Sequence, residues 1–239
     1  MTLLSRIFFS AILTGGVLFA GTVSGRVELR DSRDPLVRKK SDYSGVVIWL
    51  ESTGGAAPAR METRHAKMIQ KDKTFSPHVL VVTVGTVVDF PNLDPIFHNA
   101  FSNYNGQLFD VGLYPPGGSR KVHFTRPGVV RIFCNIHSSM SSIILVLKTP
   151  YFAATKRDGS FEIADVPPGQ YTVHVFHERA TAPTLAALSS RVTVTDEPLT
   201  LPAMSISESG YLPIPHKNKY GRDYSPATDD VNLYPGSKK

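Results

Sequence analysis

The stretch GVVRIFCNIHSSMSSIILVL, residues 128–147, decides how this sequence is interpreted. It begins and ends with apolar, β-branched runs, Val129–Phe133 and Ile143–Leu147, which are typical of β-strands. A short polar loop between them holds three side chains at the spacing Cys-x-x-His-x-x-Met, namely Cys134, His137 and Met140. Because a turn between adjacent strands can direct such side chains at one point, we predict a pair of strands that carries a loop of metal ligands.

The rest of the chain also favours short strands over long helices. Its 239 residues include 18 Gly and 18 Pro, and Val, Thr, Tyr and Phe are plentiful. Val79–Val84 and Thr86–Phe90 flank Gly85, and Val122–Phe124 precedes a Pro127-Gly128 turn. We therefore predict an all-β protein in which residues 61–149 form a β-sandwich. One short helix candidate lies at 183–190.

The composition of the loop indicates copper. His98 follows the strand that ends at Phe90 and could reach the same end of the sandwich. Two imidazoles, a thiolate and a weak axial thioether are the ligand set of a mononuclear blue-copper site. The alternative is that Cys134, the single cysteine, is a small buried hydrophobic residue. A free thiol would be exposed to oxidation in an exported protein, and a metal would protect it.

Residues 67–148 resemble the cupredoxins, the plastocyanin-like blue-copper proteins, and the loop spacing is similar to that of amicyanin. The resemblance rests on Phe75-Ser76-Pro77 before a Val-rich strand, on Gly85, on His98-Asn99 and on Pro127-Gly128. It implies a Greek-key β-sandwich that holds one copper ion. It also implies strong ligation by His98, Cys134 and His137, with Met140 as the long axial ligand.

The same resemblance implies outer contacts that hold the ligands. The Asn99 amide would donate to the Cys134 sulfur, and the Asn99 side chain would brace the loop. Asn135 stands where the family usually has a hydroxyl residue, so its bracing contact should differ. Ser138 and Ser139 replace the Pro and aromatic residue of amicyanin-like loops. The resemblance therefore does not establish the family's apolar docking patch around His137, or the identity of a partner.

A second small β-sandwich is expected from the segments that precede and follow the first one in the sequence. Residues 150–178 resemble the carboxypeptidase regulatory-like, or transthyretin-like, sandwich through Asp158-Gly159-Ser160-Phe161 and Pro167-Pro168-Gly169. We expect residues 22–60 and 150–206 to form this domain, with the copper domain inserted in a loop. The alternative is that residues 22–60 add strands to the copper domain. Residues 207–239 have no periodicity and predict an extended, irregular tail.

The N-terminus predicts export. Arg6 precedes an apolar stretch from Ile7 to Phe19, and residues 1–20 fit a signal peptide that ends at a small residue. An uncleaved anchor is the alternative. No later stretch reaches membrane-spanning length, so a periplasmic protein without an integral membrane segment is expected. The net charge of +6 is spread along the chain, which indicates a solvated surface or steering toward an acidic partner. Nucleic acid is not an expected partner.

These features predict an electron carrier that is not an enzyme. Its partners would be redox proteins such as a c-type cytochrome or a periplasmic dehydrogenase. Two alternatives stay open: a periplasmic protein for copper delivery or storage, and an adhesive β-sandwich that binds no copper. Other histidines do not suggest a rival site. His174 and His177 should point to opposite faces of a strand. The remaining four are expected to be isolated at the surface: His65, His78, His123 and His216.

Overall fold

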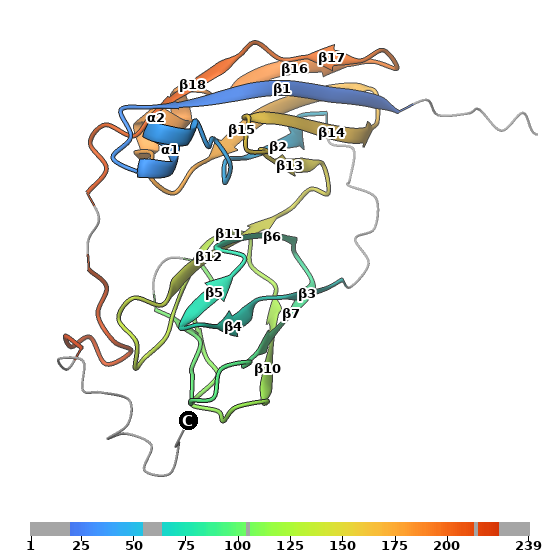
Figure 1. The fold of residues 1–239 in the computed structure, drawn as a ribbon. Coiled ribbons are helices and arrows are strands. Elements are labelled where there is room, and N and C mark those ends of the chain that lie inside the picture. The colour runs from blue at the N-terminus through green and yellow to red at the C-terminus, as the bar shows by residue number, and fades with distance from the viewer. Residues whose placement is uncertain (1–19, 55–63, 104–105, 213–214, 225–239) are drawn as a thin grey trace, which may run out of the picture.

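The computed structural model describes residues 20–54, 64–103, 106–212 and 215–224, and within them the all-β prediction is confirmed (Figure 1). Of the five sheets in the described residues, the four larger ones lie in layers, in the upper and lower halves of Figure 1. We call the upper pair the accessory sandwich and the lower pair the metal-loop sandwich. The predicted signal peptide lies outside the described residues, apart from Ala20.

The accessory sandwich combines strands from both ends of the described chain. Its outer sheet contains β14 (Ser160–Val166), β1 (Gly21–Arg30), β17 (Leu199–Thr200) and β18 (Met204–Ser207). Its inner sheet has the order β13 (Phe152–Ala154), β2 (Val47–Ser52), β15 (Gly169–Phe176) and β16 (Ser190–Val194). β1 pairs antiparallel with β14, and β2 pairs antiparallel with β15. Residues 21–52 therefore join strands that follow residue 150.

The metal-loop sandwich lies between these two segments in the sequence. Its first sheet has the order β6 (Val79–Thr83), β12 (Ser141–Leu147), β11 (Gly128–Phe133), β8 (Phe101–Ser102) and β9 (Phe109–Asp110). Its second sheet has the order β10 (Ser119–Phe124), β7 (Thr86–Pro91) and β3 (His65–Lys67), and β4 (Ile69–Lys71) pairs with β5 (Thr74–Ser76) beside it. The core between the sheets includes Phe90, Phe124, Ile132 and Ile144.

β12 is buried on both faces, which explains the continuous apolar run Ile143–Leu147 in its sequence. Ile144 and Val146 face the core of the metal-loop sandwich. The alternate residues of the same strand form a separate cluster with the inner sheet of the accessory sandwich, and its buried members are Val47, Ile143, Leu145, Leu147 and Phe176. The two sandwiches thus share an apolar interface, with β12 as the central strand of that interface.

Two six-residue helices complete the described elements. α2 (Ala182–Ala187) lies where the helix candidate was expected. α1 (Pro35–Lys40) was not expected; it begins after the N-cap Asp34, whose side chain accepts a hydrogen bond from the Leu36 amide. Pro35 at its first position is a typical start signal. Neither helix approaches the length and apolarity that crossing a membrane requires.

Candidate metal centre

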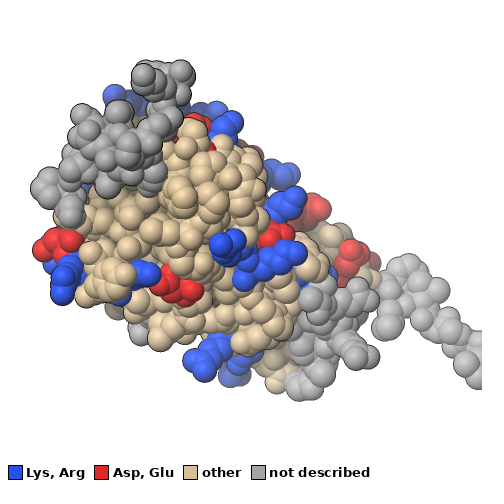
Figure 2. Space-filling view, turned by 90° about the horizontal axis from the view of Figure 1, so that it is seen from below, with Lys and Arg blue, Asp and Glu red and all other residues tan. Residues whose placement is uncertain are grey.

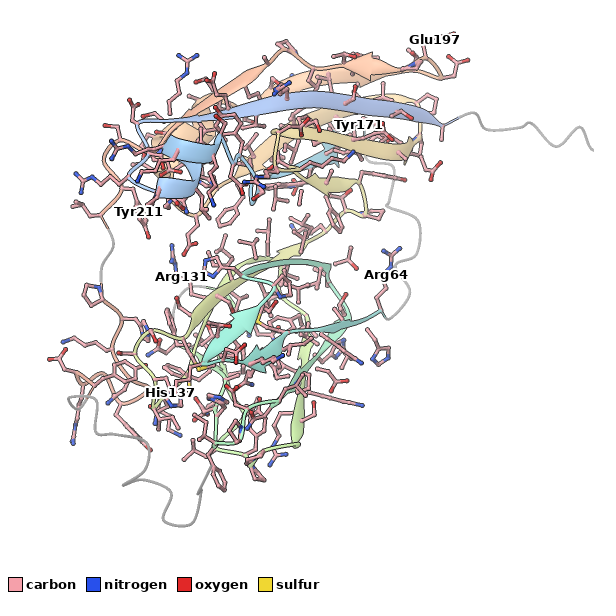
Figure 3. All side chains as sticks on the ribbon, in the orientation of Figure 1. Arg64, Arg131, His137, Tyr171, Glu197 and Tyr211 are labelled. Atoms are coloured by element: carbon pink, nitrogen blue, oxygen red, sulfur yellow. The ribbon has the colours of Figure 1, made fainter. Side chains whose placement is uncertain are left out.

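Three of the predicted ligands meet at one end of the metal-loop sandwich. His98 lies between β7 and β8, Cys134 follows β11 directly, and His137 lies in the loop before β12. The Cys134 Sγ atom lies 3.9 Å from His98 Nδ1 and 3.6 Å from His137 Nδ1. One ligand atom from each residue falls within 4.8 Å of the others. Figure 3 shows His137 in the lower half of the molecule, away from the accessory sandwich.

The backbone of the loop forms a closed turn around these ligands. The Cys134 amide donates to the Met140 carbonyl at 3.1 Å, and the Met140 amide donates to the His137 carbonyl at 3.1 Å. Met140 is fully buried and belongs to the same apolar cluster as Cys134. The structure therefore places Met140 in the core at the closing position of the loop, and its role as axial ligand stays a prediction.

His98 is held from a different part of the sequence. Its amide donates to the Tyr114 carbonyl at 3.2 Å, and the Tyr114 amide donates back to the His98 carbonyl at 2.9 Å. β8 then pairs with β11 through Phe101 and Phe133, the residue before Cys134. These two contacts bring a loop that lies 36 residues upstream into register with the cysteine.

Asn99 joins both sides of the site. Its side-chain oxygen accepts from the Asn135 amide at 3.2 Å, and its side-chain nitrogen donates to Asp110 at 2.7 Å. Burial raises the pKa of the Cys134 thiol, although hydrogen bonds from the amides of Ile136 and Asn99 oppose that shift. Those amides would stabilise a metal-bound thiolate. Asn135 has a different environment: its side-chain oxygen accepts from the Lys219 amide at 3.0 Å.

Asp94 is a site residue that the sequence analysis missed. Its Oδ2 atom lies 2.7 Å from His98 Nε2, and the amides of Asp72 and Lys73 donate to its carboxylate at 2.6 and 2.9 Å. Burial alone would raise the pKa of Asp94, but the hydrogen bonds from Lys73, His98 and Asp72 outweigh it, so the pKa lies below its usual value. A carboxylate at Nε2 holds the proton there and orients the ring so that Nδ1 of His98 faces Cys134 Sγ.

The donor set fits copper. A thiolate suits Cu(I), imidazole nitrogen suits both copper oxidation states, and the three donor atoms converge in a buried place. Cys134 and His98 are completely buried, whereas His137 is half-buried. The carboxylate behind His98 is the outer support that metal-ligating histidines usually have.

Comparison with known proteins gives likenesses of structure alone. No protein-family model matches this sequence, and no curated protein matches it. Cupredoxins are among its structural neighbours. A purple cupredoxin from Nitrosopumilus maritimus is 28% identical, with 34% of this chain and 99% of that chain covered, at a TM-score of 0.32. A reduced variant of amicyanin is 16% identical, with 41% and 98% covered, at a TM-score of 0.34.

An enzyme is also among the structural neighbours of this chain. The Cu-containing nitrite reductase from Thermus scotoductus SA-01 is 27% identical over 41% of this chain, at a TM-score of 0.34. The match spans 25% of the reductase chain. All of these likenesses cover less than half of the present chain, so its function has to be derived from the geometry of the site.

Some expectations about the other histidines are wrong. His78 is not isolated, because its Nε2 atom lies 2.6 Å from Glu178 of the accessory sandwich. His216 is not isolated either: its ring stacks on Phe133 at 4.0 Å, next to the ligand Cys134. Both contacts join residues more than 80 positions apart, so no local sequence pattern could predict them.

Proposed function

We propose that this protein binds one copper ion through His98, Cys134 and His137, with Met140 as the fourth ligand, and carries single electrons between redox proteins. The observation that carries the proposal is the convergence of one sulfur and two imidazole nitrogens within 4.8 Å. The contact between Asp94 and His98 Nε2 supports it, because it orients the His98 ring with Nδ1 toward the cysteine.

The same geometry favours electron transfer over catalysis. Four protein donors leave no coordination position for a substrate. Cys134, His98 and Met140 are buried in a packed β-sandwich core, which restricts their movement when the charge of the metal changes. His137 alone among the four has partial exposure, so the electron would enter and leave at its ring. The protein is in this proposal a carrier and not an enzyme.

A docking face would lie beside the site. Leu93 is 57% exposed, Phe97 38% and Leu113 52%, and all three lie on the loops that lead to His98 and Tyr114. Figure 2, which views the molecule from below, shows a broad area free of charged side chains, with both basic and acidic side chains around it. The partner that fits is a periplasmic redox protein with an apolar face, such as a c-type cytochrome or a dehydrogenase, and the net charge of +6 would favour an acidic one.

The test is the visible spectrum of the purified chain with one equivalent of Cu(II). We expect an intense thiolate-to-copper charge-transfer band that is lost in Cys134→Ser and in His98→Ala. His65→Ala is the matched control, because His65 is exposed on β3 and should leave the band intact. No copper binding in either oxidation state would refute the proposal.

Copper delivery or storage is the second candidate function. Ser138 and Ser139 form an exposed polar tip next to His137, where an electron carrier would gain from an apolar surface. This candidate predicts a protein that remains colourless with Cu(II) and retains Cu(I) through Cys134 and Met140. The spectrum therefore separates the two functions, and a reversible one-electron couple would favour the carrier.

A further inference from the structure

The C-terminal segment 215–224 lies on the ligand loop. It follows β18 of the accessory sandwich, and Figure 1 shows the orange-red chain running from that sandwich down to the far end of the metal-loop sandwich. The segment contains no strand or helix, as the tail prediction implied. Its described residues nevertheless make several contacts with the stretch from Phe133 to Ser138, and two of these contacts are hydrogen bonds to backbone carbonyls of the loop.

Two aromatic residues of the segment contact loop carbonyls. The Tyr224 hydroxyl donates to the Cys134 carbonyl at 2.7 Å. His216 Nε2 donates to the Ser138 carbonyl at 2.8 Å, and its ring stacks on Phe133. The Tyr224 hydroxyl also lies 3.1 Å from His216 Nδ1, so the two side chains support each other. Together they contact the loop on both sides of His137.

A third residue connects the segment to the outer contacts of the site. The Lys219 amide donates to the Asn135 side-chain oxygen at 3.0 Å, and Lys219 Nζ pairs with Asp110 at 2.7 Å. Asp110 accepts a hydrogen bond from Asn99, and Asn99 accepts one from the Asn135 amide. The contacts form a closed ring in which the segment, the loop and the β8–β9 region hold one another.

We propose that residues 216–224 act as a strap, with Tyr224, His216 and Lys219 as positioning residues that hold the ligand loop in its metal-binding shape. The inference rests on the proposed copper function. The loop from Asn135 to Ser139 contains no proline and ends in two exposed serines, so its own sequence does little to restrict it. The strap hydrogen-bonds the carbonyls of Cys134 and Ser138 and the side chain of Asn135, which disfavours other loop conformations and preorganises Cys134 and His137.

The test compares four variants of the full chain, first without metal. Tyr224→Phe and His216→Leu each remove one hydrogen bond to the loop, and His216→Gln restores a donor. Tyr151→Phe is the control, since it removes a hydroxyl inside the accessory sandwich beside Tyr171. Hydrogen exchange of the amides in 134–140 should become roughly two- to tenfold faster in Tyr224→Phe and His216→Leu, as expected for one lost hydrogen bond. It should return toward the original rate in His216→Gln.

The copper-loaded chains supply a second readout. Release of Cu(I) to a chelator should accelerate by a similar factor in Tyr224→Phe. Its reduction potential should fall, because a hydroxyl dipole that favours the less positive copper ion is removed. Unchanged exchange, release and potential in both strap variants would refute the strap. If the unaltered chain binds no copper, the proposed function fails, and the exchange rates of the metal-free chains still decide whether the strap holds the loop.

Discussion

At the scale of single residues, the charge around the buried thiol decides what the site can do. Cys134 is completely buried, and burial raises the pKa of its thiol, so metal binding must displace a proton. A negative charge that would partly balance the positive charge of a bound copper ion lies on the other side of His98, at Asp94. Asp94 is 6% exposed and accepts three hydrogen bonds. Asp94 should therefore govern both the orientation of His98 and the preference for the more positive copper ion.

We expect Asp94→Asn to lower copper affinity by about 10- to 100-fold, the usual cost of losing an outer partner of a ligating histidine. The reduction potential should rise, because the removed negative charge stabilised Cu(II) more than Cu(I). Competition with a chelator and voltammetry measure the two effects. Asp89→Asn is the control: Asp89 lies on β7 of the same sandwich and accepts from Ser119. Equal effects in both variants would show that total charge, and not the contact with His98, is responsible.

At the scale of elements, tight turns fix which strands pair. The Asp158-Gly159 turn lies directly before β14, and Gly159 has a φ of +83°. Its carbonyl accepts from the Val27 amide at 2.9 Å, so this turn joins β14 to β1 at the start of their pairing. A Cβ atom at position 159 would lie 2.0 Å from the Val27 carbonyl oxygen. The position therefore needs glycine both for its backbone conformation and for the close approach of β1.

Gly159→Ala should lower the free energy of unfolding by about 2–5 kcal/mol, from left-handed strain and from displacement of β1. Gly85→Ala is the matched control. Gly85 also has a positive φ, +93°, but an added Cβ would meet no atom within 4 Å. It should cost about 1–2 kcal/mol, the strain alone. Urea denaturation of both variants measures the difference, and equal losses would contradict the proposed clash with Val27.

At the scale of the whole molecule, the two sandwiches meet through an apolar cluster and a small group of charges. Leu145 of β12 and Phe176 of β15 belong to the apolar cluster. Glu178 lies 2.6 Å from His78 Nε2 and 3.9 Å from Arg131, so it links the accessory sandwich to two side chains of the other one. Figure 3 shows Arg131 in the region between the sandwiches. The hydrogen bond to Glu178 raises the pKa of His78, against the effect of its partial burial.

This contact predicts a pH dependence of stability. Because the pKa of His78 is raised in the folded state, its stabilising contribution is complete below the ordinary value of 6.5 and is lost as the pH rises through the folded pKa. The pKa of Glu178 is lowered from 4.5, so the pair weakens again only in more acidic solution. The difference in urea midpoint between the unaltered chain and His78→Gln should be larger at pH 6 than at pH 9.

The unaltered chain has to be compared with the His78→Gln variant because His177 changes the stability with pH in the opposite direction. Burial lowers the pKa of His177, which outweighs its hydrogen bond to Glu208, so its contribution is lost as the pH falls. That contribution is common to both chains and cancels in the difference. A difference that stays constant with pH would show that the contact between His78 and Glu178 contributes no charge-dependent stability.

What the sequence by itself determined is local. The period-two pattern and the apolar runs of β11 and β12 predict strands because side chains alternate across a sheet. The spacing of Cys134, His137 and Met140 indicates a ligand loop because seven residues suffice to form it. The helix α1 was not predicted because six residues are too few to show a helical period, although Asp34 and Pro35 are typical helix start signals.

Only the tertiary structure decided the contacts between distant segments. The sequence left open which sandwich residues 22–60 join, and in the described part of that range β1 pairs with β14 and β2 with β15, strands that follow residue 150. Three further contacts also join segments that share no sequence pattern. They connect Asp94 with His98, Glu178 with His78, and Tyr224 of the strap with Cys134. The physical reason is that such contacts depend on how sheets pack and loops cross, whereas periodicity reports only which face of its own strand a residue occupies.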